Sequence, residues 1–374
     1  MKIIVNGNDL SNAVMKVSKA ISVKTTNPVL EGIKLSVSGD LLTLSATDME
    51  IAIEKTIISD TLMEGKTVVP GKIFAEFVKK LENEDQVELV LEDDSKLKIV
   101  YGSSEVFLSV ISADQFPSIE KTNRENAFSL LQKDFKDLIN KTVFSCSTDE
   151  SRPILKGCLF EVEEDELTCV AIDGFRLAVA KKKVKNSNAP FKVVVPARSL
   201  NEICRLLEND DQEITFISEG NKFMIEVDQT VFITRLLEGN FVNYKQIIPN
   251  EFITTVKVSR NAFLSSLERA TVVAKEAKNL VKLDIKENYI NVSANSESGN
   301  VNENVIINLE GKDLSIAFNS KYLCDALKAA GDEFVNIYLN SSISPCVIKP
   351  YSGEEYLYLI LPIRINSWKN INCQ

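Results

Sequence analysis

The chain has 374 residues, of which 44% are hydrophobic, 26% charged and 7% aromatic, which is typical of a soluble globular protein with two or three domains. Its formal net charge of −10 by itself argues against a nucleic-acid partner. The N-terminal MKIIVNGNDL lacks a signal-peptide pattern, and no apolar run approaches the roughly 18 residues of a membrane span.

Reactive residue types are scarce. The chain has no histidine, which removes the commonest general base and most metal sites, and it contains no glycine-rich phosphate loop. Seven cysteines show no CxxC spacing and lie mostly in apolar runs, so we predict reduced core thiols in a cytoplasmic protein. The carboxylate pairs Asp93/Asp94 and Asp210/Asp211 lie in polar loops and are interpreted as solvated. We therefore expect no catalytic residues, no metal and no cofactor.

The first predicted helix lies in NDLSNAVMKVSKAI (8–21) and is anchored by Leu10. Similar helices follow at offsets of 125 and 128 residues, in QKDFKDLINKTVF with anchor Phe135 and in RNAFLSSLERATVV with anchor Phe263. Each carries a base six residues after its anchor, namely Lys16, Lys141 and Arg269.

A second helix also occurs three times, in VVPGKIFAEFVKKL (68–81), VVPARSLNEICRLL (194–207) and SKYLCDALKAAG (320–331). Apolar or small residues three, four and seven positions after the anchors Phe74, Leu200 and Leu323 form one helix face. Bases two before and five after each anchor lie about 20° apart on the opposite side. These bases are Lys72, Lys79, Arg198, Arg205, Lys321 and Lys328. An acid two positions after each anchor is predicted to pair with the base four residues before it: Glu76, Glu202 and Asp325.

Alternating β-type segments lie between the helices. ATDMEIAI (46–53) and AIDGFRLAV (171–179) are 125 residues apart, whereas the third position, SANSESGNV, is degenerate. Closing runs near a proline follow at DQFPSI, NYKQIIP and YLILPIR. The pattern predicts three copies of one α+β unit of about 125 residues, which we place at 1–122, 126–249 and 251–374.

Positive charge is concentrated in the predicted helices. The windows 9–20, 72–81, 132–143, 197–207, 260–271 and 320–330 sum to +7, which leaves −17 for the rest of the chain. A single charged helix face is usually only solvated. Six net-positive helices in an acidic protein instead indicate faces that attract phosphate mildly.

The chain resembles the bacterial sliding clamps, the beta subunit family of DNA polymerase III. The matching segments run in family order through TNPVLEGI, LSATDMEIAI, VVPGKIF, DQFPSI, SRPILKGCLFE, AIDGFRLAV, VVVPARSLNEI and YLILPIR, covering residues 1–364. The resemblance implies a DNA-clamp fold with two helices packed on antiparallel sheets in each of three domains. It also implies a head-to-tail homodimer, a ring of six domains around duplex DNA, lined by the helices. Weak phosphate contacts would permit sliding without sequence preference.

The family also binds short apolar peptides of the replicative polymerase, the clamp loader and repair proteins. By resemblance, that pocket comprises Leu155, Ile172, Gly174, Phe175, Arg176, Leu177, Val242, Ile247, Leu359, Ile360, Leu361, Pro362 and Ile363, with Tyr322, Pro345 and Arg152 in its neighbouring part. Without the resemblance, most of these would be interpreted as ordinary strand and core residues. Family members often have methionine at positions 361 and 363, so this pocket is expected to be less pliable.

The resemblance adds Lys24 as a DNA contact and places the subunit interface at Val106 and Leu108 of one chain and Val272 and Val273 of the other. Residues 365–374, INSWKNINCQ, extend past the family's usual end and include the only tryptophan, Trp368. Two interpretations of this tail remain open: a disordered terminus, and a segment that contacts the nearby pocket.

Three functional hypotheses follow. The leading one is a ring-forming processivity clamp without catalysis. The second is a repeat scaffold that binds proteins but not DNA, and the third is an enzyme that uses carboxylates and a metal. Retention on circular against linear DNA separates the first two, and metal-dependent turnover is required by the third.

Overall fold

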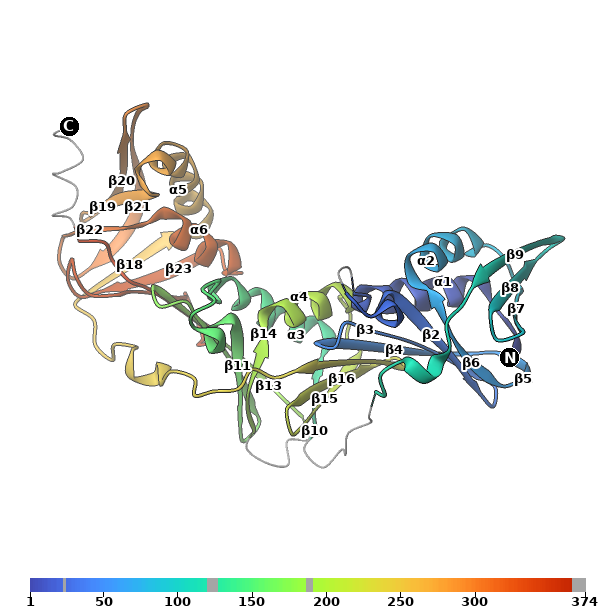
Figure 1. Ribbon diagram of the computed structural model, residues 1–374. Helices are drawn as coiled ribbons and strands as arrows, with labels where there is room; N and C mark the ends of the chain where they lie inside the picture. Colours follow the sequence, from blue (N-terminus) through green and yellow to red (C-terminus); the bar gives the residue numbers. More distant parts are fainter. Residues whose placement is uncertain (23–24, 120–126, 186–190, 365–374) are drawn as a thin grey trace. The chain divides into compact units, whose positions relative to one another are not determined.

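The computed structural model describes residues 1–22, 25–119, 127–185 and 191–364 (Figure 1). The chain divides into two compact units, the first comprising Met1–Gln132, Lys185–Asn188 and Glu202–Leu236, and the second Lys133–Val184, Ala189–Asn201 and Leu237–Gln374. In the described ranges, no helix is long and apolar enough to cross a membrane.

The first unit contains two antiparallel sheets. The smaller has the order β5-β1-β7-β8-β9, with β5 (Asp60–Met63), β1 (Lys2–Val5), β7 (Val87–Glu92), β8 (Lys96–Tyr101) and β9 (Ser104–Ser109). The larger has the order β10-β15-β16-β17-β4-β3-β2-β6. Its strands are β10 (Ala127–Leu131), β15 (Glu213–Glu219), β16 (Lys222–Val227), β17 (Thr230–Arg235), β4 (Ile51–Ile58), β3 (Leu41–Thr47), β2 (Gly32–Ser38) and β6 (Gly65–Pro70). Helices α1 (Gly7–Val17) and α2 (Gly71–Val78) belong to this unit.

The second unit contains one sheet of 12 strands, in the order β14-β11-β12-β13-β25-β24-β23-β18-β21-β20-β19-β22. The strands are β14 (Phe191–Pro196), β11 (Gly157–Glu163), β12 (Glu166–Ile172), β13 (Arg176–Lys183), β25 (Tyr356–Ile360), β24 (Cys346–Pro350), β23 (Phe334–Leu339), β18 (Thr254–Ser259), β21 (Gly299–Glu310), β20 (Tyr289–Ser296), β19 (Leu280–Ile285) and β22 (Leu314–Asn319). Helices α5 (Arg260–Ala274) and α6 (Ser320–Ala329) pack against each other in this unit. Helix α3 (Gln132–Asn140) belongs to it from Lys133 onward, and α4 (Ala197–Leu206) crosses the boundary between the units.

The six predicted helix anchors are confirmed as core residues, each at most 1% exposed: Leu10, Phe74, Phe135, Leu200, Phe263 and Leu323. Side-chain caps begin two of the helices. The Asn6 side chain accepts hydrogen bonds from the backbone N–H groups of Asn8 and Asp9, and the Asn319 side chain accepts one from Lys321. In α1 and α6, apolar periodicity and side-chain capping therefore agree.

The 8-stranded and the 12-stranded sheet each combine strands of two successive repeats. Strand β4 of the first repeat pairs with β17, the closing strand of the second, and Ala52 lies opposite Ile233. Strand β13 of the second repeat pairs in the same way with β25 of the third, and Leu177 lies opposite Leu359. The compact units therefore do not coincide with single repeats, and the predicted domain limits stay a prediction.

Candidate functional site

Most of the predicted basic positions on the helices lie at the surface. Lys72, Lys79, Arg198, Arg205, Arg269, Lys321 and Lys328 are exposed, and Lys16 is half-buried. Lys24 lies outside the described residues.

Lys141 is the exception. Its side chain is largely buried, its Nζ lies 2.7 Å from Asp137 Oδ2, and it lies over the Tyr356 ring. Helical spacing continues to Lys141, whose N–H donates to the Asp137 carbonyl, but contacts with β25 cover its side chain. Lys141 is therefore part of a partly buried ion-pair cluster with Asp137 and Lys182, and its prediction as an exposed phosphate contact is not supported.

Two of the three acids on the second helix family have partners that the sequence pattern did not predict. Glu202 Oε1 accepts a hydrogen bond from Arg205 Nη1 at 2.7 Å, and Asp325 Oδ2 accepts one from Arg176 Nη1 at 2.7 Å. Arg205 lies three residues after Glu202 on the same helix, whereas Arg176 comes from β13. The sequence pattern located these acids on the helices but did not identify the tertiary partner of Asp325.

The predicted peptide-pocket residues lie in the second unit. Some are buried, and we call these the floor of the predicted pocket; others are exposed, and we call these its rim. Leu155, Ile172, Leu177 and Leu359 form one buried cluster with Tyr244, and Ile247 packs against it. Ile360 is buried, while Tyr322, Pro345, Pro362 and Ile363 are half-buried. The rims expose Phe175 at 57%, Val242 at 42% and Leu361 at 37% of their surfaces. Exposed apolar side chains around an apolar floor are suited to an apolar peptide.

Backbone hydrogen bonds hold the rim in place. Leu361 donates its N–H to the Phe175 carbonyl at 2.9 Å, and Ile363 donates its N–H to the Ala317 carbonyl at 2.8 Å. These bonds fix the chain beyond β25 against the loop before β13 and against β22. Residues 365–374, including Trp368, lie outside the described residues, so the two interpretations of the tail stay predictions.

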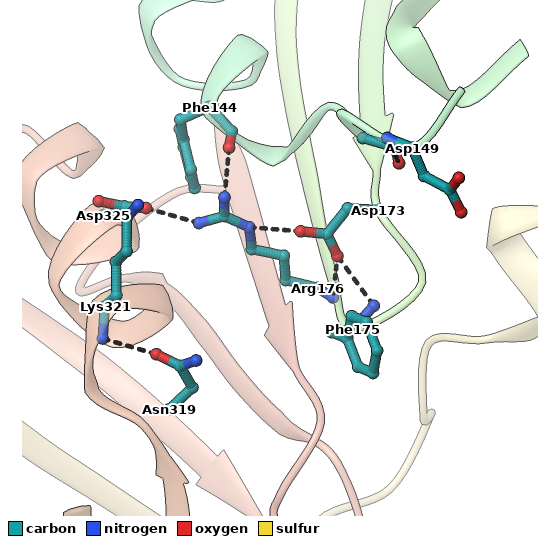
Figure 2. A network of polar contacts seen from close by, with 9 residues as sticks. Phe144, Asp149, Asp173, Phe175, Arg176, Asn319, Lys321 and Asp325 are labelled. Atoms are coloured by element: carbon teal, nitrogen blue, oxygen red, sulfur yellow. Dashed lines mark hydrogen bonds and ion pairs between the residues drawn. The ribbon is translucent and has the colours of Figure 1, made fainter. Parts of the chain in front are cut away.

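Arg176 is the centre of a polar network beside this pocket (Figure 2). Its Nε donates to Asp173 Oδ2 at 2.9 Å and its Nη2 to the Phe144 carbonyl at 2.6 Å. Asp173 Oδ1 in turn accepts from the backbone N–H groups of Phe175 and Arg176. The guanidinium also lies 4.5 Å from the centre of the Tyr322 ring, whose pKa is raised mainly by burial.

The sequence repeat contained a signal for part of this network. Asp48, in ATDMEIAI, accepts from the backbone N–H groups of Glu50 and Ile51 in the turn that corresponds to Asp173. The repeated aspartate therefore shapes the same turn twice, and only the second copy adds an arginine.

Gly174 is required by its backbone conformation, and the Arg152 guanidinium lies close to it. Its φ is +95°, and a Cβ atom at this position would lie 2.9 Å from Arg152 Nη1. Arg152 is exposed and its Nε lies 3.3 Å from Asp149 Oδ2. An accessible cation therefore lies beside the apolar rim.

The predicted interface residues lie on two open elements. Strand β9 is the last strand of its sheet, and there Val106 and Leu108 are half-buried while Phe107 is 48% exposed. At the end of α5, Val272 is 76% exposed and Val273 is half-buried. Strand β21, in contact with α5, pairs with β18 only through residues 307–310 in the described part of the chain, so its first half has an open edge.

Comparisons with known proteins agree with one another over almost the whole chain. Family models described as the N-terminal, central and C-terminal domains of the DNA polymerase III beta subunit match residues 1–120, 129–243 and 245–364. A protein named beta sliding clamp from Halalkalibacterium halodurans is 36% identical over 97% of this chain and 100% of its own length. Another from Staphylococcus aureus is 34% identical over 92% of this chain and 94% of its own.

Solved structures give the same result. The DNA polymerase sliding clamp from Bacillus subtilis is similar with a TM-score of 0.93 and 32% identity, covering 97% of this chain and 99% of that one. The DNA polymerase III subunit beta from Pseudomonas aeruginosa is similar with a TM-score of 0.92 and 26% identity, covering 97% and 100%.

Proposed function

The chain belongs to the DNA polymerase III beta subunit family, and from that membership we propose how its side chains bind DNA, partner peptides and a second copy of itself. It is a sliding clamp, a processivity factor for DNA replication without catalysis of its own, built from three clamp domains. A role in bacterial replication is consistent with the cytoplasmic location predicted from the cysteines.

DNA contacts are assigned to the exposed bases on the helices. Lys72, Arg198 and Lys321 occupy the same position in three copies of one helix, and all three are exposed. Because such contacts reach only phosphates, they hold duplex DNA without reading its sequence. Encirclement, rather than affinity, keeps the protein on DNA, so weak contacts are sufficient and permit sliding.

Partner proteins are assigned to the pocket in the second unit. The buried floor and the exposed side chains of Phe175, Val242 and Leu361 suit a short apolar peptide from the polymerase, the clamp loader or a repair protein. Arg152, beside that rim, is suited to a polar or acidic group of the same peptide.

Ring closure is supported by the sheet continuity between repeats. The closing strand of each later repeat pairs with the preceding repeat, as β17 does with β4 and β25 does with β13. Only β9, the corresponding closing strand of the first repeat, and β21, the corresponding strand of the third, have no such partner in the described part of the chain. We assign β9 of one chain to β21 of a second, which repeats the same joint head to tail.

The repeat also specifies a register for this joint. Asn300 lies opposite Asn295 at the end of its hairpin, as Ala52 lies opposite Thr47. Phe107 lies three residues past the turn that pairs Tyr101 with Ser104, as Ile233 lies three residues past the turn that pairs Val227 with Thr230. Since Ala52 pairs with Ile233, Asn300 should pair with Phe107 of the second chain, and Val301 with Val106.

Replacing both Val272 and Val273 with aspartate should produce folded monomers. Closure would bury two carboxylates without partners, at a cost of several kcal/mol each. The mass in solution, measured by light scattering, should fall from about twice 41.7 kDa to a single chain.

The matched control replaces Ile58 and Leu62, which are 74% and 65% exposed and lie outside the assigned interface. Their change to aspartate adds the same charge and should leave the dimer intact. A variant at 272 and 273 that still runs as a dimer places the closure surface elsewhere.

A further inference from the structure

One ion pair connects the peptide pocket with helix α6 (Figure 2). Arg176 lies on β13 between the pocket residues Phe175 and Leu177, and its Nη1 donates to Asp325 Oδ2 at 2.7 Å. Asp325 lies on α6, between Lys321 and Lys328 in the sequence. This ion pair therefore joins the two surfaces named in the proposed function, the peptide pocket and the basic face of α6.

The Arg176 side chain is held in one orientation by its partners. It is 10% exposed, and it donates to two carboxylates, Asp173 and Asp325, and to the Phe144 carbonyl. A planar guanidinium has its donors in fixed directions, so the loss of one partner allows the group to turn. Asp325 therefore helps to set where Arg176 lies.

The orientation of Arg176 in turn affects the pocket rim. Its guanidinium lies over the Tyr322 ring, and that ring stacks on the Phe175 ring with centroids 6.4 Å apart. Phe175 is one of the exposed apolar side chains of the rim. Asp325 thus acts on the rim through Arg176, Tyr322 and Phe175 without lining the pocket itself.

The same pair also alters the charge of α6. Asp325 is the only acid in α6, four residues after Lys321 and three before Lys328, and residues at these spacings are neighbours on a helix surface. An unpaired carboxylate at this position would weaken the attraction of Lys321 for a phosphate. Pairing with Arg176 cancels that charge.

We propose that Asp325 is a positioning residue for the peptide pocket, and that Arg176 keeps α6 attractive to DNA by neutralising Asp325. The inference rests on the proposed function, since it takes both the pocket and the α6 face as binding surfaces. It predicts that the two members of the pair have the same effect on partner binding and opposite effects on DNA binding.

The test measures two affinities for each variant. The first is the affinity of the immobilised full chain for the replicative polymerase of the same organism. The second is the affinity of the full chain for a short fluorescein-labelled DNA duplex at low salt. Asp325→Asn should weaken polymerase binding about tenfold, the effect of losing one hydrogen bond to a charged group. It should strengthen duplex binding about two- to fivefold, because the substitution removes the negative member of a neutral ion pair and leaves the positive charge of Arg176 uncancelled.

Arg176→Gln should also weaken polymerase binding about tenfold, but it should weaken duplex binding about two- to fivefold because Asp325 is left unneutralised. Arg176→Lys keeps the charge but not the planar donors, so it should weaken polymerase binding and leave duplex binding near the wild-type value. General misfolding lowers both affinities in every variant and cannot produce opposite signs.

Glu268→Gln provides a matched control. Glu268 Oε1 lies 2.8 Å from Lys328 Nζ, so its neutralisation removes an acid from the same basic face without touching Arg176. It should strengthen duplex binding as Asp325→Asn does, with polymerase binding unchanged.

Failure of the proposed function and failure of the positioning role give different results. A wild-type chain that binds neither polymerase nor duplex overturns the proposed function, and this inference with it. A wild-type chain that binds both, with unchanged polymerase affinity in Asp325→Asn, overturns the positioning role alone. Duplex affinities that shift in the same direction for Asp325→Asn and Arg176→Gln overturn the charge argument.

Discussion

Polymerase binding and stimulation are expected to be lost when Val242 and Leu361 are both replaced with aspartate. Both side chains are exposed at the pocket rim, at 42% and 37%, so the substitutions leave the core intact. An apolar anchor that buries about 100 Å² gains about 2.5 kcal/mol from leaving water. When the peptide docks against two carboxylates, this favourable free energy is lost and the cost of desolvating the carboxylates is added. Polymerase affinity should therefore fall at least about 100-fold.

Leu177 is less suitable for this test, although it is one of the predicted pocket residues. It is 1% exposed, so an aspartate there would test the stability of the sheet rather than docking. The matched control is Ile253→Asp, at a position that is 57% exposed in the same unit and outside the pocket. This control should bind polymerase normally, and all variants should remain dimers. Normal polymerase binding by the Val242 and Leu361 variant would exclude this pocket as the docking site.

Reversing the charge of Lys72, Arg198 and Lys321 to glutamate should prevent productive association with DNA. The three positions are exposed, so the fold and the dimer should persist. A closed ring would carry six reversed charges toward the duplex, and a surface that attracted phosphate would repel it. Loading onto circular DNA and polymerase stimulation on DNA should both fail, whereas polymerase binding without DNA should be largely retained.

A variant with the same change in net charge tests whether position matters. Lys66, Lys185 and Lys286 are exposed and lie outside the helices, each paired with a carboxylate at the surface. Their reversal to glutamate should leave loading close to the wild-type level. Equal loss in both variants would mean that overall charge, rather than the helix faces, controls DNA association.

The sequence was informative where local periodicity decides the structure. The anchors Leu10, Phe74 and Leu323 are buried because apolar residues at helical spacing form one face, and the structure confirms this. The prediction of an exposed base at Lys141 failed because Tyr356, more than 200 residues away, covers its side chain, and helical periodicity does not indicate such tertiary contacts.

Sequence periodicity does not predict which residues distant in the sequence contact each other. Asp325 pairs with Arg176, 149 residues away, although a nearer lysine was available by helix geometry. The third copy of the β4-type strand was degenerate in sequence, yet β20 and β21 form the corresponding hairpin with Asn295 opposite Asn300. The backbone hydrogen bonds between β20 and β21 form although the side chains of this segment differ from those of the other two copies. The pocket residues were predicted from family resemblance alone, because buried strand residues such as Leu177 look the same with or without a pocket above them.

A covalently closed ring would establish whether two chains close around DNA through β9 and β21. The register assigned above places Val106 of one chain opposite Val301 of the other, so Val106→Cys with Val301→Cys should permit a disulfide at both joints. The doubly substituted protein is loaded onto nicked circular DNA, oxidised, and then exposed to denaturant. The protein should stay with circular DNA and should be released when the DNA is cut or the disulfides are reduced. Release from intact circular DNA as fast as from linear DNA, despite complete cross-linking, would contradict it.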